Sequence, residues 1–340
     1  MLVYTSITKS YLPKARVLGR SLKRHNPDWR LCVILCDTPP AGFDVSAEPF
    51  DELVTLDQLG LPNWKAWAFG HDVVELCTGV KGAAAKLLAD RDGEDRLIYL
   101  DPDILVCAPL QPLAELLDHH EIVLTPHLLD PESDPQAVVD NEICVLRHGV
   151  FNLGFLGVRM KGQGRRFIDW WSARLERHCL ADPQNGLFTD QKWVDLAPAF
   201  FDGVYVVRDK GCNVATWNIH RRPIRRNGDG LLEAGGARLR FYHFTGYDSG
   251  DGRGMLLKYA GQQIEALELW DAYGRELAAN GHRDPALDHF AYGFFSNGAP
   301  IDKRLRRLYR ARPDLQEAFP DPFEVRKWSL YNWWREEQRS

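Results

Sequence analysis

Residues Arg96–Cys107 read RLIYLDPDILVC, and this stretch decides what kind of fold the chain can adopt. Its apolar runs, LIYL and ILVC, are typical of strands in a buried sheet, yet Asp101 and Asp103 stand between them. Burying an unpaired carboxylate is costly, and two carboxylates this close raise each other's pKa. A positive partner is therefore expected, and oxygen ligands at this spacing suit Mg²⁺ or Mn²⁺. The alternative is an ordinary turn, which Asp-Pro-Asp forms readily.

The sequence around this stretch alternates between strand and helix patterns. Short apolar runs, such as RLCVILCD, are separated by segments whose apolar residues recur at helical spacing. This alternation predicts an α/β fold with a mixed, mainly parallel sheet flanked by helices. Ligands of such sheets bind outside the carboxyl ends of the strands. Polar breaks fall at three predicted strand ends, so we expect one polar edge formed by Thr5-Ser6, Asp37 and Asp101–Asp103.

A third metal ligand is expected from the far end of the chain. The apolar run LRFYHF predicts a strand that carries His243 just before Thr245 and Gly246. The glycine lets the backbone approach a ligand closely. The alternative for His243 is a histidine whose hydrogen bonds are satisfied inside the core.

Further polar residues lie where strands or helices are predicted to begin or end. Asn152, in VFNLGFLGV, offers an amide that can hold a hydroxyl group, although an ordinary strand with a bulge at Gly154 is the alternative. Asp190 and Gln191, in FTDQKW, stand at a predicted helix start, where helix capping is the alternative. Lys86, on the predicted helix GVKGAAAKLLADR, is expected to reach a phosphate or to be an ordinary solvated lysine.

Composition narrows the function. A net charge of −5 over 340 residues argues against a dedicated nucleic-acid binder. The seven cysteines contain no C-x-x-C pair and fit a reducing cytoplasm. Polar residues soon break the N-terminal apolar run, so no signal peptide is predicted and a cytoplasmic location is expected. The tryptophan-rich tail KWSLYNWWREEQRS, near basic clusters, is expected to cap the core or to make peripheral contact with the inner face of a membrane.

Several motifs together resemble one family of enzymes. In order, YTSITKSYLPKARVLGRSL, LIYLDPDILV, FNLGFLGV, TDQKWV and HFTG are similar to GT-A-type glycosyltransferases. They are most similar to the retaining family that contains glycogenin and the lipopolysaccharide galactosyltransferases, and to related bacterial surface-glycan glycosyltransferases. The resemblance implies a Rossmann-like GT-A domain over residues 1–250 and a helical C-terminal extension over residues 251–340. Within the domain, residues 1–107 would be the nucleotide-binding half and residues 108–250 the acceptor and sugar half.

The resemblance also implies roles for single residues. Asp101, Asp103 and His243 match the metal ligands, with Asp103 expected to bind the ion most directly. Asp190 and Gln191 match residues that face the anomeric carbon and act in catalysis. The donor would be a nucleotide-diphosphate sugar, with a UDP-sugar as the first expectation, bound with Mn²⁺ or Mg²⁺. Donor-binding positions of the family are matched by Thr5, Ser6, Asp37, Lys86 and Asn152.

The chain departs from this family at one position. The family usually follows its histidine motif with a Lys-Pro-Trp that grips the diphosphate, whereas this chain reads YDSGDGRGMLLKY. Arg253 or Lys258 is expected to substitute for that lysine.

The predicted function is metal-dependent transfer of a sugar, with retention, to a glycan or lipid-linked acceptor in bacterial surface-polysaccharide synthesis. A sugar-phosphate nucleotidyltransferase is one alternative, although YTSITKSY lacks the glycine-rich loop that usually follows its first strand. A non-catalytic nucleotide-sugar-binding module is the other. Dehydrogenase, P-loop, serine-hydrolase and zinc-protease functions are disfavoured because their short motifs do not occur in the sequence.

Overall fold

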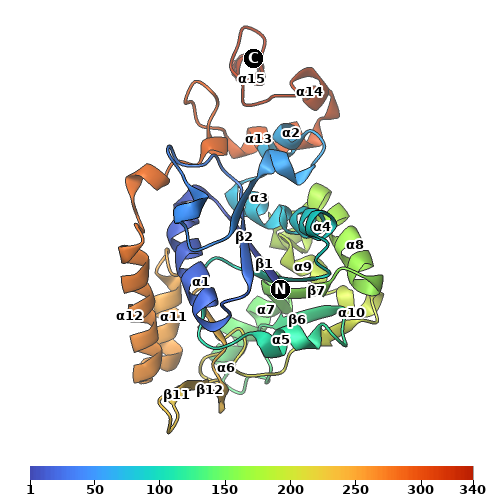
Figure 1. The fold of residues 1–340 in the computed structure, drawn as a ribbon. Helices are drawn as coiled ribbons and strands as arrows, with labels where there is room; N and C mark the ends of the chain where they lie inside the picture. The colour runs from blue at the N-terminus through green and yellow to red at the C-terminus, as the bar shows by residue number, and fades with distance from the viewer. Residues whose placement is uncertain (340) are drawn as a thin grey trace.

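The computed structural model describes residues 1–339 and has a seven-stranded sheet at its centre (Figure 1). The strand order is β10-β6-β7-β4-β1-β2-β3. Strand β7 runs antiparallel to both of its neighbours, and the other strands are parallel to one another. The predicted mixed, mainly parallel sheet is therefore confirmed. Its strands are β1 (Leu2–Ile7), β2 (Arg30–Leu35), β3 (Glu52–Thr55), β4 (Arg96–Leu100), β6 (Ile122–Pro126), β7 (Phe151–Arg159) and β10 (Val204–Val206).

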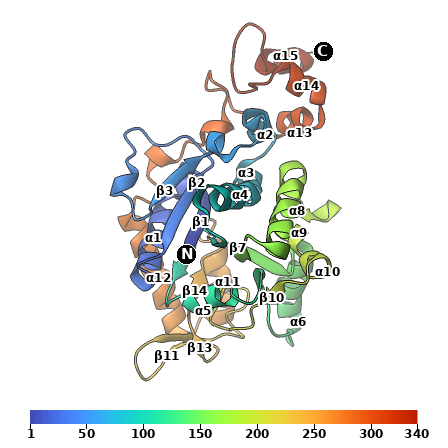
Figure 2. The same cartoon turned by 45° about the vertical axis from the view of Figure 1, so that its right-hand side comes forward.

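Helices cover both faces of this sheet, which explains why its strands are apolar on both sides (Figures 1 and 2). Helices α1 (Leu12–His25) and α5 (Gln111–Leu116) pack on one face, and α4 (Lys81–Asp92) and α8 (Gly162–His178) pack on the other. Successive residues of a strand point to opposite faces. In β1, Val3 accordingly packs in the core under α1, and Tyr4 packs in the core under α4 and α8.

Shorter elements surround the central sheet. Small sheets pair β5 (Ile104–Val106) with β14 (Phe241–His243), β8 (Ala181–Asp182) with β9 (Leu187–Phe188), and β11 (Ile224–Arg226) with β12 (Leu232–Ala234) and β13 (Ala237–Arg238). A π-helical turn, Val138–Ile143, joins α6 (Pro135–Ala137) to α7 (Cys144–His148). The other short helices before residue 250 are α2 (Trp64–Phe69), α3 (Val73–Gly79), α9 (Gln191–Val194) and α10 (Ala197–Phe200). Single 3₁₀ turns span Lys9–Tyr11, Val45–Ala47, Leu56–Leu59, Pro183–Asn185, Pro285–Leu287 and Ala291–Gly293.

The C-terminal part is helical, as predicted, and it packs in two places. Helices α11 (Asp251–Ala260) and α12 (Ile264–Ala279) lie beside α1 (Figure 1). Helices α13 (Lys303–Ala311), α14 (Pro313–Ala318) and α15 (Leu330–Glu337) form a cluster with Phe69 of α2. The division of the chain at residue 250 stays a prediction.

The tryptophan-rich tail belongs to this second cluster. Leu330 is buried, and Trp333 and Trp334 pack against the same apolar group, whereas Trp328 is 67% exposed. Much of the tail therefore covers apolar surface, and its contact with a membrane stays a prediction. None of the helices within residues 1–339 has the length and apolar character that crossing a bilayer requires.

Arg306 anchors α13 to the rest of the chain. Its Nη1 donates to the carbonyls of Phe69 and His71 at 2.9 and 3.0 Å, and its Nη2 donates to the carbonyl of Tyr292 at 2.5 Å. Burial lowers the pKa of the Arg306 guanidinium to about 10. The side chain is 6% exposed, so these three carbonyls depend on it for their hydrogen bonds.

Replacing this anchor should destabilise the protein. We expect Arg306→Met to lower the free energy of unfolding by about 3 kcal/mol, because it leaves buried carbonyls without a donor. Arg304→Met, on the exposed side of the same helix, is the matched control and should change it by less than about 0.5 kcal/mol. Urea unfolding followed by tryptophan fluorescence measures both values, and equal stabilities would contradict the anchoring role.

Candidate functional site

The pairing of β5 with β14 brings His243 to the two aspartates. In this antiparallel pair His243 lies opposite Ile104, and the amide of Phe244 donates to the carbonyl of Asp103 at 2.9 Å. The His243 Nε2 atom is 3.1 Å from Asp103 Oδ1 and 3.6 Å from Asp101 Oδ2. One ligand atom from each of the three residues lies within 4.8 Å of the others. The three predicted metal ligands thus stand together.

The chemistry of this donor set fits a divalent cation. Two carboxylates and one imidazole are ligands that Mn²⁺ accepts, and carboxylate oxygens also suit Mg²⁺. Burial by itself would raise the pKa of Asp103, but His243 and Lys14 outweigh burial and hold that pKa at about 2. Burial would lower the pKa of His243, but Asp103 and Asp101 raise it overall. The carboxylates therefore favour a proton on this imidazole, and a cation bound here would compete with that proton.

Two further contacts, one at each ring nitrogen, fix the orientation of the His243 ring. Its Nδ1 lies 3.1 Å from Asn152 Oδ1, and the Thr245 hydroxyl lies 2.8 Å from its Nε2. Asn152 stands near the start of β7, and because β7 is antiparallel this start lies beside the end of β4. A Cβ at Gly154 would lie 2.5 Å from His243 Cε1. Glycine is therefore required at this position so that the ring can approach the strand.

Lys81 joins the aspartate pair to Asp190. Its Nζ lies 2.8 Å from Asp190 Oδ2 and 3.4 Å from Asp101 Oδ1, and it donates to the carbonyl of Leu153 at 3.0 Å. Lys81 and Asp190 are each 2% exposed. Burial raises the pKa of Asp190 in spite of the lysine beside it. Burial would lower the pKa of Lys81, but Asp101 and Asp190 raise it overall. The pair is thus held as a buried ion pair.

Asp190 and Gln191 do not cap the helix that follows them. The Asp190 carboxylate accepts from the Thr189 hydroxyl at 3.0 Å and caps no backbone amide of α9. The side-chain Oε1 of Gln191 accepts from the backbone amide of Leu153 at 3.1 Å. Its side-chain Nε2 donates to the backbone carbonyl of His148 at 3.1 Å. Both side chains therefore point toward β7 and the metal-ligand group.

A cavity of about 420 Å³ opens in front of these groups. Trp217 and Phe188 are among its walls, together with residues from the helical segment 140–148. Rings of this kind stack on the C–H faces of sugars. The predicted site residues that line this cavity are Asp101, Asn152, Asp190, Gln191 and His243.

The remaining predicted residues lie elsewhere. Thr5 is fully buried, and the Ser6 hydroxyl donates to the carbonyl of Cys77 at 2.6 Å and lies 3.0 Å from the Tyr99 hydroxyl. Asp37 is 1% exposed and accepts backbone N–H groups, including that of Ala291 at 3.0 Å. Its carboxylate therefore holds the C-terminal segment in place. None of these three side chains lines the cavity.

Lys86 is not brought to the site, and Lys81 stands there instead. Lys86 is partly exposed, and its Nζ lies 3.7 Å from Asp169 Oδ1 of α8. Five residues along a helix amount to a rotation of about 140° and a rise of about 7.5 Å, so the two lysines cannot face the same ligand. Helix α4 begins at Lys81 and runs back from the carboxyl edge of the sheet. The signal for the lysine that reaches Asp190 was thus its place at the start of the predicted helix, and a role of Lys86 in donor binding stays a prediction.

Comparison with known proteins gives distant matches. No protein-family model matches the chain. Two proteins of Bacillus subtilis (strain 168) are similar, Uncharacterized protein YfnF at 25% identity over 178 residues and Uncharacterized protein YfnD at 24% over 249 residues. These matches cover 52% and 72% of this chain, and 58% and 76% of the two proteins. The match to YfnF thus spans less than two thirds of that protein.

Solved structures with a similar chain path are glycosyltransferases. The galactosyltransferase LgtC, in complex with donor and acceptor sugar analogs, is 16% identical with a TM-score of 0.49, covering 82% of this chain and 96% of LgtC. The glycosyltransferase GlyE of Streptococcus pneumoniae TIGR4 is 18% identical with a TM-score of 0.42, covering 65% of this chain and 48% of GlyE. Mouse xyloside xylosyltransferase 1 is 17% identical with a TM-score of 0.42, and the match covers 72% of this chain and 97% of the mouse protein.

The two lysines of α4 should differ sharply in their effect on stability. Lys81→Met leaves the Asp190 carboxylate buried without its partner, so we expect the free energy of unfolding to fall by about 3 kcal/mol at pH 7. Lys86→Met removes an exposed pair and should cost less than about 0.5 kcal/mol. Chemical denaturation of both variants measures the difference, and a Lys81→Met protein as stable as the wild type would contradict the buried ion pair.

The cost of Lys81→Met should also depend on pH. The pKa of Asp190 is already raised in the folded protein, and losing Lys81 raises it further, so ionisation of this carboxyl opposes folding as the pH rises above its unfolded pKa. The stability difference between Lys81→Met and the wild type should therefore be smaller at pH 5 than at pH 7. Unfolding curves at both values test this, and a difference that widens toward pH 5 would count against it.

Proposed function

We propose that the chain is a metal-dependent GT-A-type glycosyltransferase. The observation that carries the proposal is the meeting of Asp101, Asp103 and His243 at the end of β4, beside a cavity large enough for a sugar. The donor would be a nucleotide-diphosphate sugar, and the acceptor would be a glycan or lipid-linked glycan in bacterial surface-polysaccharide synthesis. A UDP-sugar is the first donor to test.

The residues of the site would divide the work between them. Asp101 Oδ2, Asp103 Oδ1 and His243 Nε2 would hold the divalent cation. When bound, that cation would stabilise the negative charge that builds on the departing diphosphate. Lys81, which also lines the cavity, would hold the carboxylates of Asp101 and Asp190 in place through its buried ammonium. Asn152 would hold the His243 ring in the orientation that binding needs.

Asp190 and Gln191 would act on the sugar itself. Both line the cavity, and the Gln191 amide is fixed by backbone contacts on two sides. An inverting enzyme needs a free carboxylate base under the sugar. Asp190 is the carboxylate that we assign to that place, and Lys81 pairs with it at 2.8 Å. This pairing supports retention, with Asp190 and Gln191 steadying the positive charge on the sugar carbon rather than removing a proton.

The donor can be identified by its effect on melting. Nucleotide sugars with Mn²⁺ should raise the melting temperature only when they bind the folded chain, so a screen of UDP-, GDP-, CDP- and TDP-sugars selects the donor. With that donor, release of the nucleoside diphosphate measures turnover. A sugar-phosphate nucleotidyltransferase would instead release pyrophosphate from a nucleoside triphosphate, and a binding module would release neither product.

Turnover should depend on the aspartate that His243 contacts most closely. We expect Asp103→Asn to lower Mn²⁺-dependent release of the nucleoside diphosphate by at least about a hundredfold, because it removes a charged ligand from the cation. Asp118→Asn is the control and should leave the rate unchanged, since the Asp118 carboxylate forms an exposed ion pair with Arg96 at 2.9 Å and lines neither cavity. An Asp103→Asn protein with wild-type turnover would remove the basis of the proposal.

The stereochemistry of the product tests the role given to Asp190. An α-linked donor should give an α-linked product, because the acceptor would attack the face from which the diphosphate leaves. Proton NMR of the product shows which anomer forms. A β-linked product would mean that the enzyme inverts, and it would assign the base to Asp190.

A further inference from the structure

The resemblance calls for a cation that grips the diphosphate, and neither expected residue is placed to do so. Arg253 Nη1 lies 2.9 Å from Asp271 on α12. Lys258 forms an ion pair with Asp140 and lies near the ring of Tyr259. Neither residue lines the cavity in front of His243 or the second hollow described next. The diphosphate-binding cation of this chain must therefore come from another element.

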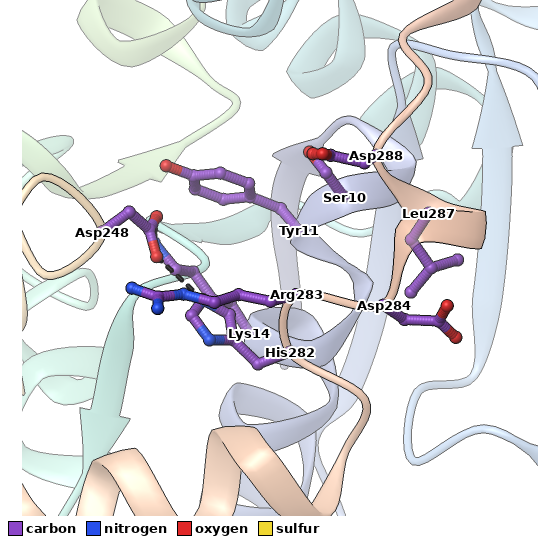
Figure 3. Close-up of a pocket in the computed structure, with 9 residues that line it drawn as sticks. All are labelled: Ser10, Tyr11, Lys14, Asp248, His282, Arg283, Asp284, Leu287 and Asp288. Atoms are coloured by element: carbon purple, nitrogen blue, oxygen red, sulfur yellow. Dashed lines mark hydrogen bonds and ion pairs between the residues drawn. The ribbon is translucent and has the colours of Figure 1, made fainter.

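A second hollow, of about 310 Å³, lies between the start of α1 and the C-terminal segment 282–288 (Figure 3). The chain that leaves the carboxyl end of β1 forms one wall, with Ser10 and Tyr11, and this is the edge where α/β sheets bind ligands. Asp248 also lines the hollow and stands in the turn after β14, where the amide of Tyr247 donates to the carbonyl of Phe244 at 3.1 Å, so the hollow adjoins the strand that carries His243.

Lys14 is the buried cation of this hollow. It is 2% exposed, its Nζ lies 2.5 Å from Asp248 Oδ2, and it sits 4.0 Å from the centre of the Tyr11 ring. An ammonium group carries three N–H donors, and these two neighbours engage at most two of them. Asp248 follows the His243 motif closely in sequence and is itself exposed. The Asp248 carboxylate therefore contacts the Lys14 ammonium in the way that a phosphate oxygen would.

Arg283 supplies a second positive charge at the rim. It is exposed, it lines the hollow together with Tyr11 and Asp248 (Figure 3), and it forms no ion pair within residues 1–339. Its backbone has a φ of 65°, a left-handed conformation that is uncommon for a residue with a side chain. Asp288 lies at the opposite end, next to Ser10 (Figure 3). The lining thus combines two cations, Lys14 and Arg283, with the Ser10 hydroxyl and the carboxylates of Asp248, Asp284 and Asp288.

We propose that Lys14, assisted by Arg283, is the cation that binds the diphosphate of the nucleotide donor in this chain. The C-terminal segment 282–288 then forms the outer wall of the nucleotide site, and the end with Ser10 and Asp288 takes the hydroxyl groups of the nucleoside. His282 Nε2, 2.8 Å from Asp248 Oδ1, holds that wall to the turn that follows His243. The inference rests on the proposed function, because it assumes a nucleotide-diphosphate donor.

Calorimetric titration with nucleoside diphosphates tests this assignment. UDP, GDP, CDP and TDP are each titrated with Mn²⁺ into the full chain, and the one that the wild type binds best is compared with its nucleoside. We expect Lys14→Met to weaken binding of the diphosphate at least tenfold and binding of the nucleoside less than twofold. Arg283→Gln should weaken binding of the diphosphate about threefold. Lys14→Arg should retain part of the diphosphate affinity that Lys14→Met loses.

Matched variants separate this inference from the proposed function. Arg253→Met and Lys258→Met remove the other two candidate cations and should leave diphosphate affinity within twofold of the wild type. Three results would overturn the assignment and leave the proposed function standing. They are wild-type diphosphate affinity in Lys14→Met, an equal loss of nucleoside and diphosphate affinity in Lys14→Met, and a loss of diphosphate affinity in Lys258→Met instead. If the wild type binds none of the four diphosphates, both the assignment and the proposed function fail.

Discussion

Three carboxylates crowd the end of one buried strand, and their need for positive charge organises the site. Asp101 and Asp103 follow β4 directly, and Asp190 comes to the same place from the start of α9. His243 and Lys81 stand among them, at 3.1 Å from Asp103 and 2.8 Å from Asp190. Because burying an unpaired ionised group is costly, each of these side chains depends on its oppositely charged neighbours to be stable there.

The antiparallel strand β7 makes this arrangement compact. A parallel strand there would end, rather than begin, at the edge where Asp101 stands. Instead the start of β7 delivers Asn152 against the His243 ring, and the absence of a side chain at Gly154 lets that ring lie on the strand. The amide of Asp101 donates to the carbonyl of Gly154 at 2.8 Å, which ties the aspartate pair to the same strand. The antiparallel direction of β7 thus sets both the order of the sheet and the positions of Asn152 and Gly154 at the site.

The C-terminal part of the chain packs against the edge of the sheet where the sequence predicted nucleotide binding. Asp37, which the sequence matched to a donor-binding position, accepts a hydrogen bond from the amide of Ala291. Arg16 Nη1 donates to the carbonyl of Asn280 at 3.1 Å, which holds the end of α12 to α1. A buried carboxylate needs hydrogen-bond donors, and where no ligand supplies them a neighbouring backbone does. The segment after residue 280 is therefore part of the same structural edge as β1 and β2.

The sequence by itself determined the features that depend on neighbouring residues. Alternating apolar runs predicted the α/β sheet, two aspartates after a buried strand predicted a cation site, and the strand around His243 predicted the third ligand. Only the tertiary structure decided which of two lysines on one helix reaches Asp190, and which partners Asp37 and Lys258 take. The physical reason is that a side chain's direction depends on where its helix begins and on what packs against it. Those facts arise from contacts between distant parts of the chain, which local sequence pattern does not encode.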